Sequence, residues 1–219
     1  MQTESSQKKS IFQTDQLIEL EPRYRAKLVN SLSGFKSLVL VGTRSSQGNN
    51  NLALFSSLFH ISANPAMCGM LIRPKKVGEN TLGNILDSGV YTLNHIREEF
   101  YREAHQTSAR YPQGASEFEE VGLHPTFIDP YFAPFVEESS IRIACELLEH
   151  QELKWNQTHL IIGKIVYIEI PEKTLNPDGY VDIEAAGSIT CSSLDSYHTT
   201  QRIARLEYAK PGIPPHLLE

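Results

Sequence analysis

The stretch NNNLALFSSLFHIS, residues 49–62, combines an apolar, strand-like pattern with many small and hydroxyl-bearing side chains. Asn, Ala and Ser lower the propensity for a β-strand, and a fold tolerates them where a flat group must approach the backbone closely. A bound planar ring is one such group. An ordinary edge strand explains the same residues, and composition alone favours that simpler interpretation.

The sequence on either side of this stretch predicts more strands. The polar loop at residues 44–51 is rich in residues that tolerate positive φ, so it predicts a hairpin turn between strands at residues 36–43 and 52–61. Further strands are expected at residues 67–72, 90–93, 141–146, 158–170 and 188–191, and helices at residues 21–32, 80–87 and 96–110. Because the strands come as short hairpin-like runs and not as alternating βαβ units, the fold class expected is mainly β: an antiparallel barrel with peripheral helices.

Length and charge restrict the class of protein. The chain has 219 residues, 40% of them hydrophobic, and a formal net charge of −6. We expect one domain at residues 21–210, preceded by a polar arm at residues 1–20 and followed by a Pro-rich tail at residues 211–219. The negative charge argues against a nucleic-acid partner, and the short apolar runs argue against a membrane span. With a polar start that does not look like a secretory signal, the expected location is cytoplasmic.

A search for catalytic and metal-binding motifs leaves the function open. The sequence contains no G-x-G-x-x-G, P-loop, G-x-S-x-G or H-E-x-x-H motif. Its three cysteines are far apart and its eight histidines are dispersed, so no metal site is expected. We expect the cysteines to be reduced and partly buried.

The order of several short motifs resembles the flavin reductase-like, FMN-binding split-barrel family, in its flavoredoxin-like branch. In the first half these are Asn51-Leu52-Ala53, Phe55-Ser56-Ser57, Ile61-Ser62, Asn64-Pro65, a strand ending at Arg73, Asn80-Thr81 and Asn84-Ile85. Later matches are His-Gln-Thr-Ser-Ala-Arg-Tyr at residues 105–111, Ser116-Glu117-Phe118, Gly122-Leu123, and His-Leu-Ile-Ile-Gly-Lys-Ile-Val at residues 159–166. Together they cover roughly three quarters of the chain in the family's order, although each motif alone is weak.

This resemblance implies a six-stranded Greek-key split barrel, a homodimer, and FMN bound near the subunit interface. The residues that it assigns to the cofactor are Asn51, Leu52, Ala53, Leu54, Phe55, Ser56, Ser57, Arg73, Thr81, Asn84 and Arg110. Small side chains in the strand would let backbone N–H groups reach the flavin edge, while the serine hydroxyls bond the ribityl chain or the phosphate.

The phosphate would need a positive charge and hydrogen-bond donors. Arg73 is the first candidate for the charge, with Lys75, Lys76 or Arg110 as substitutes. Thr81, at the start of the helix expected after Asn80, would add a hydroxyl and the helix dipole. The alternatives are a solvated turn residue for Arg73, a plain helix start for Thr81 and a solvent-facing side chain for Asn84.

The resemblance also implies the type of reaction, in which FMN accepts a hydride from NAD(P)H and passes electrons to an unidentified acceptor. His159 and Tyr197 are the catalytic candidates, lining the nicotinamide side. Around Tyr197 the chain lacks the glycines that relatives carry in the preceding turn. Two alternatives stay open: a flavoredoxin-like FMN electron carrier reduced by a protein partner, and a cofactor-free dimeric binding module.

Overall fold

A seven-stranded antiparallel sheet is the centre of the computed structural model, which describes residues 9–74, 80–112 and 114–218. The strand order in this sheet is β2-β1-β5-β8-β9-β4-β3. Its strands are β1 (Val39–Arg44), β2 (Asn50–Phe55), β3 (Phe59–Ala63), β4 (Ala66–Ile72), β5 (Val90–His95), β8 (Arg142–Leu153) and β9 (Thr158–Glu169). Two small hairpins accompany it: β6 (Pro125–Thr126) with β7 (Phe135–Val136), and β10 (Thr190–Ser192) with β11 (Ser196–His198).

The two edge strands of the sheet follow one another in the chain. β2 and β3 lie at opposite ends of the strand order, yet only residues 56–58 separate them. The sheet therefore curls until its two edges come together at this link, which leaves the barrel split there. The single strand predicted at residues 52–61 is wrong, because the chain leaves β2 after Phe55 and starts a new strand at Phe59. This break also explains why the sheet has seven strands where the resemblance implied six.

Ser57 holds the link against β4. Its hydroxyl donates to the carbonyl of Leu71 at 2.8 Å and accepts from the Leu71 amide at 3.2 Å. One side chain thus occupies both backbone groups that a neighbouring strand would otherwise pair. The strand is interrupted here because these bonds replace the ladder.

Two hydrophobic clusters stabilise the barrel, one inside it and one on its outer face. The inner cluster includes Val41, Phe55, Met70, Tyr91 and Ile161. Alternate residues of the same strands point outward, so Leu40 and Leu52 pack instead against the helical side of the barrel. There α4 (Tyr101–Gln106) and α5 (Glu117–Val121) contribute buried Ala104 and Phe118.

The remaining helical elements are short. They are α1 (Thr14–Glu19), α2 (Pro22–Ser31), α3 (Asn80–Ser88), and the 3₁₀ turns η1 (Glu98–Phe100) and η2 (Glu172–Thr174). The helix expected at residues 96–110 is shorter than predicted. Ile96 and Arg97 still belong to the sheet region, since the Ile96 carbonyl accepts from Ile189 and Arg97 forms a bridge with Ser188. At the other end, the Thr107 hydroxyl bonds the carbonyl of Ala104 and the helix stops.

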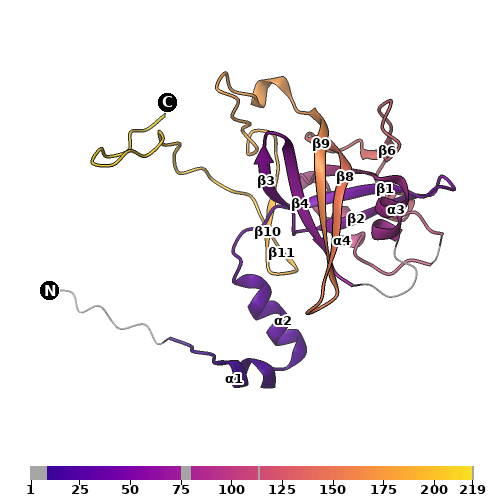
Figure 1. The fold of residues 1–219 in the computed structure, drawn as a ribbon, viewed down its shortest axis with the longest axis horizontal. Helices are drawn as coiled ribbons and strands as arrows, with labels where there is room; N and C mark the ends of the chain where they lie inside the picture. Colours follow the sequence, from indigo (N-terminus) through magenta and orange to yellow (C-terminus); the bar gives the residue numbers. More distant parts are fainter. Residues whose placement is uncertain (1–8, 75–79, 113, 219) are drawn as a thin grey trace.

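Both ends of the described chain extend away from the barrel (Figure 1). Helices α1 and α2 bury no residue against the rest of the chain. The C-terminal tail is tethered near its start, where Arg202 pairs with Asp182 and Arg205 pairs with Asp178. Both guanidinium groups also lie over the ring of Tyr180. Beyond this tether the tail leaves the body of the molecule.

All three cysteines are free and buried, in agreement with the sequence-based expectation. Cys68 and Cys145 face each other inside the barrel with their sulfur atoms 3.8 Å apart. Across the described ranges, no helix has the length and apolarity required to traverse a membrane.

Candidate flavin site

A cleft of about 1080 Å³ opens where the barrel is split. One wall is the β2–β3 link with the end of β4, and the opposite wall comes from the end of α2, the tip of the β8–β9 hairpin and the β10–β11 hairpin. The predicted site residues that line it are Leu54, Phe55, Ser56, Ser57, Arg73 and Tyr197. Residues from six separate segments of the chain therefore meet around one cavity.

The free edge of β2 supplies backbone donors to this wall. The Leu52 amide points away from β1, because it donates to the Glu117 carboxylate at 3.0 Å. Along a strand the backbone groups alternate with a period of two, so the amide of Leu54 lies on the same free edge. Leu54 lines the cleft. The Leu54 amide is therefore the backbone donor that this edge of β2 brings to the cleft.

Two cationic side chains stand at the rim of the cleft. The Arg73 guanidinium donates to the amide oxygen of Asn30 on α2 at 2.9 Å. The ammonium of Lys36 donates to the carbonyl of Ser193 at 2.8 Å. Both cations, Asn30 and Ser193 line the same cavity. The other two basic candidates in this region, Lys75 and Lys76, lie outside the described residues.

Tyr197 lies on β11 and closes the cleft from the side opposite β2. Its hydroxyl forms a 2.6 Å hydrogen bond with Nδ1 of His105 on α4. Burial, followed by the nearby Cys191 and Asp195, raises the pKa of Tyr197 to about 12. The turn before it forms without glycine, since Ser193 adopts a φ of 56°, in the left-handed region that glycine usually fills. Because the pKa of Tyr197 lies well above 7, its phenol is neutral at physiological pH.

Asn51, Thr81 and Asn84 come together, but away from the cleft lining. The Asn51 amide donates to the hydroxyls of Thr43 and Thr81, each at 3.0 Å, and the Asn84 amide donates to Thr43 at 3.1 Å. All four side chains are buried. This network fastens α3 to the hairpin of β1 and β2, and so fixes the strand that forms the cleft wall.

The other predicted residues do not line the cleft either. Leu52 and Ala53 are buried, one in the outer cluster and one in the inner cluster. Arg110 is exposed after α4, although Ser108, two residues earlier, lines the cavity. These assignments stay predictions.

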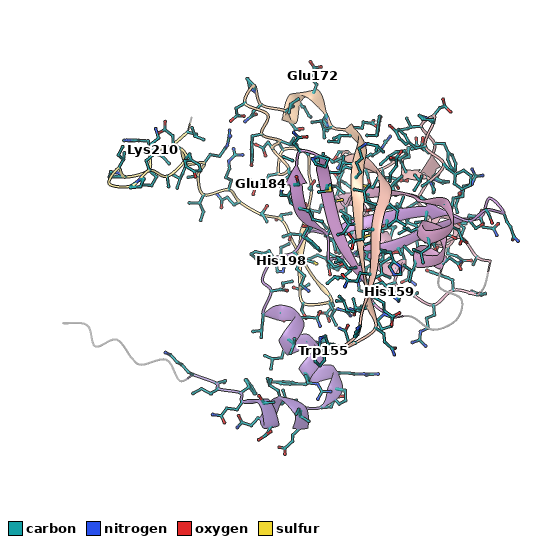
Figure 2. All side chains as sticks on the ribbon, in the orientation of Figure 1. Trp155, His159, Glu172, Glu184, His198 and Lys210 are labelled. Atoms are coloured by element: carbon teal, nitrogen blue, oxygen red, sulfur yellow. The ribbon has the colours of Figure 1, made fainter. Side chains whose placement is uncertain are left out.

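His159 lies at the start of β9, near the tip of the β8–β9 hairpin (Figure 2). Its neighbour Thr158 lines the cleft, and consecutive strand residues point to opposite faces, which turns the imidazole of His159 away. The ring stacks on His150 with the centroids 5.1 Å apart, and the two rings share a 2.9 Å hydrogen bond. Trp155, at the tip, is 99% exposed.

Sequence reasoning missed Lys36, Asn30 and Ser193. Lys36 and Ser193 are 157 residues apart in the chain, and no local motif marks either one. The aromatic loop at residues 127–135 packs in part on its own chain. Phe127 and Phe132 sandwich the Arg44 guanidinium, and Phe135 is fully buried. Among the residues described, His, Cys, Asp and Glu side chains form no group of three that could hold a metal ion.

The fold defines an antiparallel split-barrel protein with a cleft at the split of the barrel. The chain belongs to the flavin reductase like domain family, whose model matches residues 33–186. The fold class expected from the sequence, an antiparallel split barrel with peripheral helices, is thereby confirmed.

Solved structures give the same fold. A candidate flavin reductase with a split barrel domain from Shewanella frigidimarina is 44% identical, with a TM-score of 0.89, and the match covers 92% of this chain and 100% of that one. Nitrilotriacetate monooxygenase component B from Bacillus cereus is 22% identical over 92% of this chain and 100% of that one, with a TM-score of 0.79. Flavoredoxin from Desulfovibrio vulgaris is 21% identical over 82% of this chain and 92% of that one, with a TM-score of 0.67. The last two likenesses concern the fold alone.

Proposed function

We propose that this protein is an FMN-dependent oxidoreductase of flavin reductase type, which takes reducing equivalents from NAD(P)H and passes them to an electron acceptor. The observation that carries the proposal is the cleft itself, which joins apolar walls, the edge strand β2 and two cations. Family membership and the 44% identical candidate flavin reductase support it.

The groups around the cleft match the chemistry of FMN. Its phosphate is a dianion, for which Arg73 and Lys36 supply positive charge at the rim. The ribityl hydroxyls would bond to Ser56. The isoalloxazine ring would lie against Leu54, with its polar edge toward the backbone of β2. Ser57 is committed to Leu71 and contributes mainly by holding the wall in place.

The other predicted residues would support the cleft wall or lie near the cleft. Asn51, Thr81 and Asn84 anchor β2 and α3. Arg110 remains a candidate for the phosphate on a nearby loop. When bound, FMN supplies the acceptor of hydride, and the chain's residues supply orientation, shelter from water and hydrogen bonds. Tyr197 is the proposed contact opposite β2, and His159 stays a catalytic candidate on the β8–β9 hairpin, next to the cleft residue Thr158.

We also propose that the protein is a homodimer. Large apolar side chains are exposed near both ends of the described chain, at residues 9–35 and 203–218. They include Ile18, Leu32, Phe35, Ile203, Tyr208 and Leu217. Exposed apolar surface of this extent is typical of an interface, and a second copy would also cover the edges near the split. Light scattering should give twice the chain mass, whereas a monomer at micromolar concentration would contradict the proposal.

The test of function begins with the absorption spectrum of the purified protein reconstituted with FMN. We expect bound flavin, and rapid bleaching when NADH or NADPH is mixed with it anaerobically. Bound FMN that neither nucleotide reduces would favour the electron carrier that takes electrons from a protein partner. Protein that binds no FMN at all would overturn the proposal and favour a cofactor-free binding module.

A further inference from the structure

His105 does not line the cleft, but its imidazole is hydrogen-bonded to a residue that does. Its Nδ1 atom is 2.6 Å from the hydroxyl oxygen of Tyr197, and Tyr197 lines the cleft. The imidazole ring itself is exposed to solvent. The pair therefore connects bulk water to the cavity through two groups that both carry exchangeable protons.

The contact is well supported from both sides. The Tyr197 ring packs against Tyr101, one turn before His105 on α4, with the centroids 5.5 Å apart. Tyr197 and the His105 ring meet edge to face at 5.7 Å. This packing fixes the direction of the phenol, so that the 2.6 Å bond is held by the surrounding structure.

The protonation state of His105 determines what Tyr197 can offer to a ligand. When Nδ1 carries no proton, the phenol O–H donates a hydrogen bond to that nitrogen, and only an oxygen lone pair faces the cleft. When Nδ1 carries a proton, it donates to the phenolic oxygen, and the O–H is left to donate into the cleft. A change of one proton on the exposed ring thus reverses the polarity of the hydrogen bond at the cleft wall.

We propose that His105 and Tyr197 form a proton relay between solvent and the cleft; the proposal rests on the proposed function, because reduction of a flavin by a nicotinamide consumes one proton besides the hydride. The phenolic O–H bond breaks as its proton passes to an acceptor in the cleft, and a new O–H bond forms with the proton from Nδ1 of His105. Tyr197 ends neutral, and the exposed imidazole takes a proton from water. The two electrons travel with the hydride and do not pass through the pair.

The pKa of Tyr197, about 12, is consistent with this order of events. A phenol that resists ionisation does not release its proton alone, and His105 replaces that proton as it leaves. His105 is thereby a positioning and proton-supplying residue, and Tyr197 is the group that touches the ligand.

Charged groups lie around the pair. Asp195, in the β10–β11 turn, is close enough to His105 for the two charges to attract, and its own pKa is lowered first by Lys27 on α2, at 2.8 Å. Other titratable groups lie on the elements packed around the pair: Tyr101, Arg102 and Glu103 on α4, Cys191 and His198 on the β10–β11 hairpin, and Glu117, Glu119 and Glu120 on α5.

The experiment compares His105→Asn with Tyr197→Phe. Asn keeps a side-chain amide near the position of Nδ1, so it can still bond the phenol, but it cannot carry a proton. In the FMN-loaded protein, we expect His105→Asn to slow anaerobic flavin reduction by about tenfold or more, and to remove its pH dependence and solvent isotope effect. The FMN dissociation constant should not change. His124→Asn is the matched control, since His124 is exposed and has a similar 2.7 Å bond to Glu138, and neither residue lines the cleft.

A second readout needs no flavin. In nitrogen NMR spectra of the apo protein, the Nδ1 signal of His105 should shift in Tyr197→Phe and stay unchanged in His124→Asn. Unchanged kinetics in His105→Asn would overturn the relay, and so would a His105 signal that ignores Tyr197→Phe. If wild type binds no flavin, the proposed function fails and the relay's role with it, while the NMR shift still reports whether the pair exists.

Discussion

The hydroxyl of Tyr91 occupies the space that a side chain on Gly163 would need. Tyr91 on β5 pairs with Cys145 on β8, and Gly163 lies on the next strand, β9. A Cβ atom built on Gly163 would collide with the Tyr91 hydroxyl and come within 3.3 Å of the Cys145 Cβ atom. The glycine is therefore required by packing inside the barrel, and not by its backbone conformation.

Gly163→Ala should destabilise the protein by about 1–3 kcal/mol, as overpacking of a core does. Denaturant unfolding measures the loss, and the double variant with Tyr91→Phe should recover part of it. The control is Gly83→Ala, on the exposed face of α3, where nothing lies within 4 Å of an added Cβ. That substitution should stabilise the helix slightly. Equal effects at the two glycines would contradict the packing argument.

Thr43→Val should cost about 1–3 kcal/mol of stability, although it changes the side-chain volume little. The substitution removes the acceptor shared by Asn51 and Asn84, and leaves buried amide protons unpaired. Thermal and denaturant unfolding both measure the effect. Thr199→Val, at an exposed position, should be neutral. A neutral Thr43→Val would mean that the network does not fix α3 to the β1–β2 hairpin.

Arg73→Met should weaken FMN binding by about ten- to hundredfold, because the phosphate loses a charged donor. Riboflavin has no phosphate, so its affinity should stay the same. Lys36→Met should likewise weaken FMN binding and leave riboflavin affinity unchanged. Arg110→Met should change neither affinity if Arg73 and Lys36 bind the phosphate. Fluorescence titration with the two flavins makes this comparison. Equal losses for FMN and riboflavin would show that Arg73 shapes the cleft and does not bind the phosphate.

His95 should make the protein less stable in acid. Burial lowers the pKa of His95 from 6.5 to about 4. Between these two values the unfolded chain binds a proton that the folded chain does not, so folding stability falls as the pH drops through this window, by at most about 3 kcal/mol. His95→Asn, which can keep a bond to Ser188, should flatten this part of the pH profile, whereas the exposed His60→Asn should not. Identical acid profiles for wild type and His95→Asn would refute the assignment.

Local patterns in the sequence were enough for the hairpin at residues 44–51, for α3 and for the long strand β9. The break at residues 56–58 was not predictable in the same way, because Ser57 reaches the backbone of Leu71, 14 residues away. In the sequence this serine looks like any other residue of a weak strand. The packing role of Gly163 was not predictable from local patterns either, since its partner Tyr91 comes from a different strand.

The residues of the candidate site likewise fall into a group that the sequence predicted and a group that it missed. Ser56, Arg73 and Tyr197 were predicted by their place in an ordered set of motifs, and the cleft brings them together. Lys36 was missed because its partner, Ser193, belongs to the other end of the chain. Periodicity and motifs report on neighbours in sequence, whereas the rim of this cleft is assembled from segments that meet only in the folded chain.

The position of the cleft at the seam between the two sheet edges separates ligand preference from folding. Leu54 lines the cavity from the edge strand β2, and Ser56 lines it from the β2–β3 link. In that link, Ser57 is hydrogen-bonded to Leu71 of β4. Substitutions at Leu54 and Ser56 can alter what the protein recognises while the hydrogen-bonded ladder stays intact. In the proposed site, side chains at the seam can therefore change while the backbone pairing that holds the barrel together is kept.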